Sequence, residues 1–78
     1  MKFALIRNDE IEAISVGFCK PFPPKIDESV WVGSLSSRDG WITSCVMEYL
    51  SADKMHFRTM NNDYHLVPLE EYYHPLDS

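Results

Sequence analysis

The sequence contains few of the residues that would cross-link the chain, bind a metal or cradle a phosphate. Only two cysteines, Cys19 and Cys45, occur among the 78 residues, and they form no CxxC pair. A disulfide framework or a zinc knuckle needs more cysteines at closer spacing, so we expect two reduced and largely buried thiols. The three glycines form no GxGxxG or Walker pattern, so no phosphate-binding loop is predicted.

Positive charge and long apolar runs are also scarce. Seven Lys and Arg stand against twelve Asp and Glu, which gives a net charge of −5. Because binding to a nucleic-acid backbone requires clustered Lys and Arg, we do not expect direct nucleic-acid binding, and a protein partner fits better. No apolar run approaches the roughly 20 residues that span a bilayer, and "MKFALIRNDE" becomes polar too early for a signal peptide. We therefore expect a cytoplasmic protein outside the membrane.

The residues that are present predict one small folded domain over 1–78. Hydrophobic residues make up 45% of the chain and aromatic residues 13%, a globular composition rather than that of a disordered tail. This length is near the lower limit at which a single apolar core holds a chain together.

The first third of the chain predicts a β-hairpin followed by a connector. Two β-compatible runs, 3–7 and 11–16, flank Asn8-Asp9, whose side chains tolerate the positive φ of a tight turn. The density of Ile, Val and Phe favours strands over the competing helix, so residues 1–18 are interpreted as an N-terminal hairpin. In residues 19–25, "CKPFPPK", three prolines exclude a helix or a central strand.

Residues 26–78 show the alternation of strands and turns that is typical of a meander. Strands are predicted at 29–35, 41–50, 55–60 and 64–69, with turns rich in Gly, Asn, Asp and Ser between them. A short 3₁₀ turn is expected in the "PLEEYYHPL" segment. A curled meander of this kind closes into a small barrel and removes exposed strand edges.

The pattern from residue 28 to residue 76 resembles the SH3-like and Tudor-like barrel families. The matching positions are Trp41, Ser44 and Val46 in one strand and Leu69, Tyr72, Pro75 and Leu76 in the closing segment. The resemblance implies an all-β barrel of about five strands with an added N-terminal hairpin. The positions that supply the Tudor aromatic cage fall near Leu35, Ile42, Thr59 and Asn61, none of which is aromatic, so recognition of methylated Lys or Arg is not implied.

In its small size, its acidic charge and its predicted N-terminal hairpin and barrel, the chain also resembles small accessory proteins encoded by bacteriophages and mobile elements. That resemblance implies a non-catalytic protein that docks onto a larger host complex. The acidic residues allow an alternative, an inhibitor that mimics nucleic acid if its acidic clusters converge. These clusters are Asp9, Glu10 and Glu12, then Asp27 and Glu28, and finally Glu70, Glu71 and Asp77.

Strict alternation along 41–50 predicts which side chains of this strand face the core. Ile42, Ser44 and Val46 are expected inward, with Trp41, Thr43, Cys45, Met47 and Tyr49 on the other face. The outer set is interpreted either as a second small core beneath the hairpin or as an exposed binding stripe. Trp31, between inward Val30 and Val32, is expected to point outward, either free or packed against Phe22 or Ile14.

Exposed aromatic and turn residues at one end of such a barrel usually form its binding surface. The predicted binding residues are Trp31, Arg38, Asp39, Trp41, Tyr49, Tyr64, Glu70 and Glu71. His56 and His65 are expected to face each other across a hairpin, but their spacing with Cys45 or Glu48 is not specific for zinc. We therefore predict no cofactor, no metal and no enzyme activity.

Overall fold

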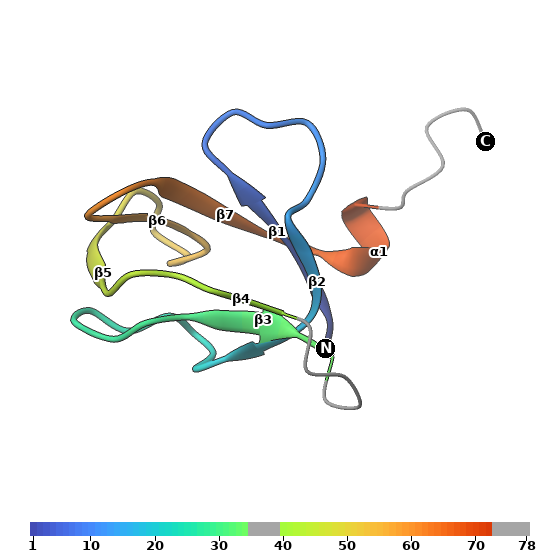
Figure 1. Cartoon of the computed structure of the whole chain (residues 1–78), viewed down its shortest axis with the longest axis horizontal. Helices are drawn as coiled ribbons and strands as arrows, with labels where there is room; N and C mark the ends of the chain where they lie inside the picture. Colours follow the sequence, from blue (N-terminus) through green and yellow to red (C-terminus); the bar gives the residue numbers. More distant parts are fainter. Residues whose placement is uncertain (35–39, 73–78) are drawn as a thin grey trace.

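The computed structural model describes residues 1–34 and 40–72, and it is all-β, as predicted. Seven antiparallel strands form one open sheet in the order β4-β3-β2-β1-β7-β6-β5 (Figure 1). The strands are β1 (Phe3–Arg7), β2 (Ser15–Lys20), β3 (Trp31–Gly33), β4 (Gly40–Ile42), β5 (Val46–Tyr49), β6 (His56–Thr59) and β7 (Asp63–Pro68). The predicted turn after β7 is a single turn of α-helix, α1 (Leu69–Tyr72).

The N-terminal hairpin lies in the middle of the sheet instead of being added to a completed barrel. All five residues of β1 pair with β7, from Phe3 opposite Pro68 to Arg7 opposite Tyr64. The physical reason is burial, since Phe3, Ala4 and Leu5 are all buried and consecutive buried residues are typical of a central strand covered on both faces. The prediction of about five barrel strands beside a separate hairpin is therefore wrong in this respect.

The boundaries of the hairpin agree with the prediction in β1 and differ in β2. Asn8 has the positive φ of 53° expected for the turn. β2, however, begins at Ser15 and continues through Lys20 into the predicted connector, and Ile11 is 91% exposed. Gly17 has a φ of 150°, and a Cβ there would collide with the carbonyl group of Gly33. This close approach of β2 and β3 requires glycine.

The predicted strand 41–50 is divided into β4 and β5. Thr43, between them, is 4% exposed, and its Oγ1 accepts a hydrogen bond from Val30 N at 3.0 Å and donates one to Ser44 O at 2.6 Å. The break changes the alternation, so that Trp41 and Val46 both pack with the core while Ile42 is 66% exposed. The inward assignment is thus confirmed for Val46 and wrong for Ile42, and the outward assignment is wrong for Thr43.

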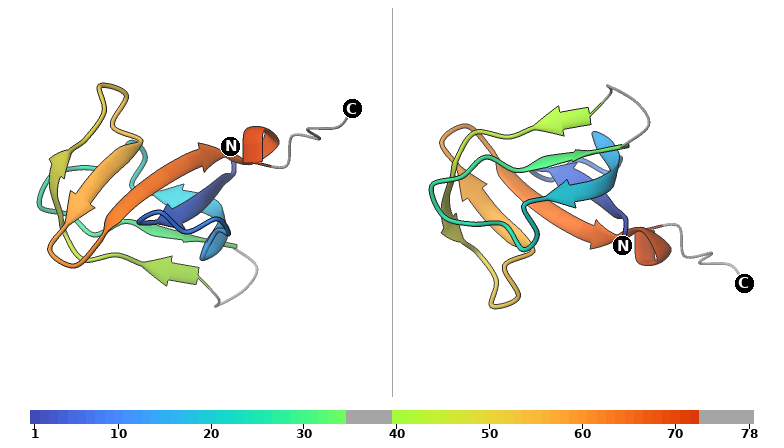
Figure 2. Two further views of the ribbon diagram at one scale, coloured as in Figure 1. Left: turned by 90° about the horizontal axis from the view of Figure 1, so that it is seen from above. Right: turned by 90° about the horizontal axis from the view of Figure 1, so that it is seen from below.

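A single core holds the sheet together, so the predicted second core beneath the hairpin is absent from the described residues. Its buried members are Phe3, Leu5, Cys19, Val30, Val32, Val46, Phe57, Tyr64 and Leu66, with Ile14, Trp41, Tyr49 and Met55 packed at the margin. The sheet bends around this core (Figure 2). Asp27 N donates to Val46 O, and Val46 N donates to Glu28 O, which links the segment before β3 to the start of β5.

α1 is hydrogen-bonded to the residue before β1 and to the segment that leads into β2. Leu69 N donates a hydrogen bond to Lys2 O at 3.0 Å. The hydroxyl group of Tyr72 accepts a hydrogen bond from Ala13 N at 3.0 Å. The helix therefore fastens both β1 and the segment that leads into β2.

Candidate functional site

An outward-facing strip crosses the strands β2, β3 and β4 at one end of the sheet. Lys20 pairs with Trp31, and Trp31 pairs with Ile42, so these three side chains lie in one row on one face. The neighbouring row, formed by Cys19, Val32 and Trp41, lies on the core side. Phe18 precedes Lys20 by two residues and shares its face. We call Phe18, Lys20, Trp31 and Ile42 the edge strip.

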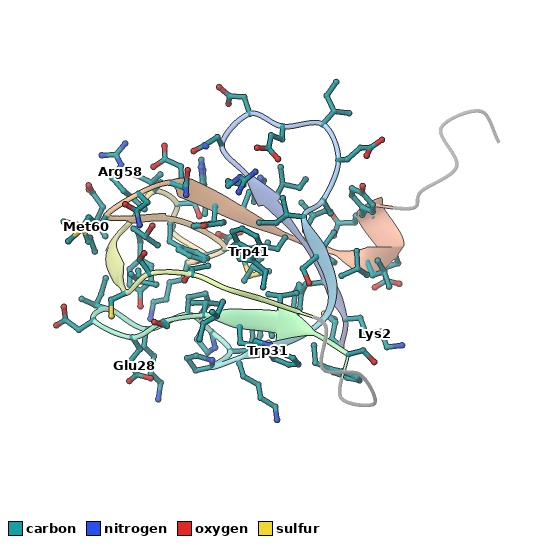
Figure 3. The ribbon with its side chains drawn as sticks, in the orientation of Figure 1. Lys2, Glu28, Trp31, Trp41, Arg58 and Met60 are labelled. Atoms are coloured by element: carbon teal, nitrogen blue, oxygen red, sulfur yellow. The ribbon has the colours of Figure 1, made fainter. Side chains whose placement is uncertain are left out.

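Two glycines form the floor of the edge strip. Phe18 pairs with Gly33, and Gly33 pairs with Gly40, so the row beside Trp31 has no side chains in β3 and β4. A Cβ on Gly40 would lie 2.6 Å from Nε1 of Trp31, which shows that the indole lies over Gly40. In Figure 3 Trp31 is labelled on the far side of β3 from the layer that contains Trp41. The indole is thus half-buried and lies over the backbone of this glycine row.

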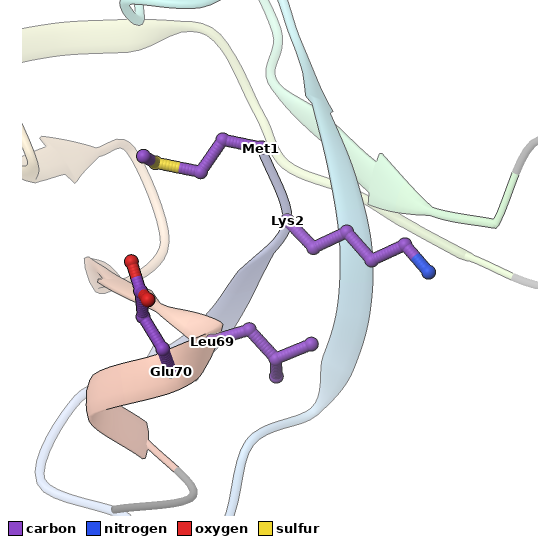
Figure 4. Close-up of a pocket in the computed structure, with 4 residues that line it drawn as sticks. All are labelled: Met1, Lys2, Leu69 and Glu70. Atoms are coloured by element: carbon purple, nitrogen blue, oxygen red, sulfur yellow. The ribbon is translucent and has the colours of Figure 1, made fainter.

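Lys2 adds a second positive charge beside Phe18 of the edge strip. Its Nζ lies 5.6 Å from the centroid of the Phe18 ring, within the range of a cation–π contact. The side chain reaches this position by extending across β2 (Figure 4). Met1, Lys2, Leu69 and Glu70 also line an open, mainly apolar depression of about 400 Å³ on that side of the molecule.

Among residues 1–34 and 40–72, no strand pairs with the backbone of β4 on the side away from β3. Thr43 N donates to Val30 O, so Thr43 and Val30 form a hydrogen-bonded pair of the antiparallel ladder. Such pairs recur at every second residue, so the next one is Trp41 with Val32. The N–H and C=O groups of Gly40 and Ile42 consequently point away from β3. Both views in Figure 2 place β4 at the rim of the sheet, and the strand order ends there.

The opposite edge of the sheet, β5, is protected from further pairing. Its first residue, Val46, forms a parallel bridge with Ile26, and the ladder with β6 is irregular between Val46 and Glu48. Glu48 is charged and is hydrogen-bonded by Arg58 at 3.0 Å. Bulges and charged residues are common devices that prevent edge-to-edge pairing. β4, with the sequence Gly-Trp-Ile, has neither.

Trp41 and Tyr64, two predicted binding residues, are brought together at the margin of the core. Trp41 Nε1 donates to the Tyr64 hydroxyl oxygen at 3.2 Å, and the Arg7 guanidinium lies 5.2 Å from the Trp41 ring centroid. Asn62 Nδ2 donates to the same hydroxyl oxygen at 3.4 Å. Tyr64 is only 3% exposed, so this pair joins β4 to β7 and offers little surface to a partner.

Tyr49, Glu70 and Glu71, three further predicted binding residues, are not part of the edge strip. Tyr49 is half-buried, donates its hydroxyl proton to Pro24 O at 2.7 Å and has Lys54 Nζ 5.5 Å from its ring centroid. Glu70 and Glu71 lie on α1 and are exposed. Arg38 and Asp39 lie outside the described residues.

The acidic clusters in the described ranges 1–34 and 40–72 lie on different elements, although the hydrogen bond from Ala13 N to the Tyr72 hydroxyl oxygen connects the end of the β1–β2 loop to α1. Asp9, Glu10 and Glu12 lie in the β1–β2 loop, whereas Glu70 and Glu71 lie on α1 (Figure 1). Figure 3 labels Glu28 on the opposite side of the molecule from that loop. Some of the charge is also neutralised locally, because Arg7 pairs with Glu10 at 3.0 Å and Arg58 pairs with Glu48 and Asp63 at 3.0 Å each.

His56 and His65 face each other across β6 and β7, as predicted. Their rings are stacked with centroids 5.2 Å apart. Burial lowers the pKa of His65, and the positive charge of His56 lowers it further, while Asp53 opposes this shift. In the part of the chain that the structure describes, no three His, Cys, Asp or Glu residues gather in a way that could hold a metal ion.

The two thiols differ in exposure. Cys19 is buried, and desolvation raises the pKa of its thiol to about 11. Cys45 is exposed, so the prediction that both thiols are buried is wrong for Cys45. The break between β4 and β5, which changes the alternation, accounts for this difference.

Comparison of the chain with protein families, curated proteins and solved structures found no match. Over residues 1–34 and 40–72, no helix has the length and apolar character needed to cross a membrane.

Three of the four edge-strip residues were missed by sequence reasoning. Phe18 and Lys20 were assigned to the end of the hairpin and to the connector, and Ile42 was assigned to the core. Trp31 was found because the valines on both sides of it mark the inward face, and both are 0% exposed. The same rule applied to Cys19 would have indicated that its neighbours Phe18 and Lys20 point outward.

Proposed function

We propose that this protein is a non-catalytic interaction module that binds a partner protein through the edge strip. The observation that carries this proposal is the combination of Trp31 with Ile42, which is 66% exposed, beside a strand edge that pairs with no further strand in the part of the chain that the structure describes. Tryptophan is enriched at binding hot spots because it buries a large area with little loss of conformational freedom. Backbone groups at a sheet edge add directional hydrogen bonds.

A non-catalytic role is supported by the chemistry of the described side chains. The Cys19 thiol, with its pKa raised to about 11, is a poor nucleophile because the thiolate is the reactive form. The Ser44 hydroxyl oxygen accepts a hydrogen bond from Asn61 Nδ2, and the Ser51 hydroxyl group donates to Asp53. Asn61 is not a base, and the hydrogen bond from Ser51 lowers the pKa of the Asp53 carboxyl group, which makes this carboxylate a weak base.

The sheet, which bends around a single core, also supports our proposal of an SH3-like barrel. We extend the proposal to an accessory role, in which the protein docks onto a larger complex in the cytoplasm of a host cell. The alternative inhibitor, which mimics nucleic acid, receives less support because Glu28 lies on the opposite side of the molecule from the β1–β2 loop, and because Arg7 neutralises Glu10 in that loop.

A peptide-display selection on the immobilised full chain tests the proposed function. Selected peptides should bind the wild-type chain and lose at least about tenfold in affinity to Trp31→Ala and Ile42→Asp, which corresponds to about 1.4 kcal/mol. Met60→Asp is the matched control, because Met60 is 80% exposed in the β6–β7 turn, away from the edge strip. Selected peptides that bind all three variants equally would refute the proposal, as would a selection that enriches no peptide.

A further inference from the structure

The edge strip lies at a strand edge that pairs with no further strand of the described residues, and it carries the exposed Ile42 beside the half-buried Trp31. Lys20 belongs to the same row, and Lys2 lies over the ring of Phe18. We propose that the edge strip takes an extended, acidic segment of a partner protein, which pairs with β4 as a further strand of the sheet. This inference rests on the function proposed above and specifies the conformation and the charge of the segment that is bound.

The backbone of β4 favours an extended partner. The N–H and C=O groups of Gly40 and Ile42 point outward, because Thr43 N bonds to Val30 O and thereby sets the alternation of the ladder. Two residues spaced in this way offer up to four main-chain hydrogen bonds to a strand laid beside them. A helix that docked here would leave these groups unpaired, because its own backbone groups already bond to one another.

The side chains of the edge strip add an apolar contact on one face of such a strand. Ile42 lies on β4 itself, and Trp31 lies directly behind it on β3. Alternate residues of an added strand would project over Ile42 and toward the indole. Gly40 carries no side chain, and the Trp31 ring lies over it, so the added strand would meet the indole and not a side chain of Gly40. The segment is therefore expected to have apolar residues at alternate positions.

The distribution of charge selects an acidic segment. The chain has a net charge of −5, yet the two cationic groups beside the strip, Lys2 and Lys20, form no ion pair within the described ranges, whereas Arg7 and Arg58 do. Lys20 shares its row with Trp31 and Ile42, and Lys2 lies over Phe18. Two unpaired cations on one face of an acidic protein create a local field that attracts carboxylates and repels lysines.

A second copy of the chain is a weaker candidate for the same edge. Two β4 strands that paired edge to edge would bring together two molecules with a net charge of −5 each, and the Lys20 rows would face the same surface. Mutual repulsion opposes that arrangement. A molar mass in sedimentation equilibrium that doubles with concentration, and that returns to the monomer value in Ile42→Asp, would overturn the assignment to a partner segment.

The display selection described above also supplies the probes for this inference. We expect the enriched peptides to alternate apolar and acidic residues. Synthetic versions should shift the amide NMR resonances of Gly40 and Ile42 and the indole resonance of Trp31. N-methylation of the peptide backbone on the bonded side should weaken binding at least about tenfold. Resonance shifts confined to other strands, or full affinity after N-methylation on both sides, would overturn strand pairing.

Charge reversal tests the acidic preference separately. Lys2→Glu with Lys20→Glu should weaken an acidic peptide at least about tenfold and should improve the matched peptide in which Lys replaces each acidic residue. Lys54→Glu is the control, since Lys54 lies in the turn between β5 and β6. Enriched peptides that depend on Trp31 but are neutral or basic would overturn this inference and leave the proposed function intact. A selection with no peptide dependent on Trp31 would overturn both.

Discussion

Replacing Thr43 with valine tests the hydrogen bonds that divide the predicted strand 41–50 into two. Thr43 is 4% exposed. Its Oγ1 accepts from Val30 N at 3.0 Å and donates to Ser44 O at 2.6 Å. Valine has nearly the same shape as threonine but can neither accept nor donate a hydrogen bond with its side chain. In the valine variant, the buried Val30 N–H therefore has no acceptor at this position. Leaving a buried polar group unsatisfied costs about 1–3 kcal/mol, and the half-exposed Ser44 carbonyl group recovers part of its loss from water.

We therefore expect Thr43→Val to lower the free energy of unfolding by about 2 kcal/mol. For a domain of this size, that corresponds to a fall in melting temperature of roughly 8–16 °C. Urea unfolding followed by tryptophan fluorescence measures the first quantity, and a thermal scan by circular dichroism measures the second.

Thr43→Ser is the matched control, because serine keeps the hydroxyl group and loses only a methyl group. The serine variant should lose about 1 kcal/mol or less. A valine variant as stable as the wild type, or more stable than the serine variant, would refute the role assigned to this hydroxyl group.

Three further predictions concern separate parts of the molecule. Gly40→Val should displace the Trp31 indole, whose Nε1 lies 2.6 Å from the position of the added Cβ; a red shift in tryptophan fluorescence reports this, and an unchanged spectrum would contradict it. The folded state disfavours protonated His65, since burial and His56 lower its pKa; stability should therefore decrease as the pH falls through about 6.5. The urea midpoint of His65→Gln should decrease less between pH 7 and pH 5 than that of the wild type, and equal decreases would count against this assignment. In the native state, a thiol reagent should modify the exposed Cys45 and leave the buried Cys19 unreacted; mass spectrometry of Cys45→Ser distinguishes the two sites, and rapid labelling of that variant would disprove the prediction.

Local patterns in the sequence predicted the strands well where one signal dominated. β1 has the predicted bounds of 3–7, and β6 and β7 fall within or next to their predicted ranges. In each case a run of apolar or alternating residues ends at clear turn residues, and Asn8 adopts the predicted positive φ. The all-β fold follows from these local signals alone.

The sheet order and the edge strip depend on contacts that the local pattern does not contain. Thr43 is compatible with a continuous strand, and only its contacts with Val30 and Ser44 reveal the break. That break reverses the faces of Trp41 and Ile42, so a binding surface predicted by strict alternation is placed on the wrong side of β4. The pairing of β1 with β7 likewise depends on contacts between segments that are far apart in the sequence, so local patterns do not predict it.

The pairing of β1 with β7 has a consequence for how the chain acquires its structure. Phe3 lies opposite Pro68 and Arg7 lies opposite Tyr64, so the central ladder of the sheet joins two segments from opposite ends of the described chain. The chain loses conformational entropy when it closes this long loop, and it does so before the contacts between β1 and β7 can form. This loss slows folding. During synthesis, β1 cannot form this ladder until β7 has also left the ribosome.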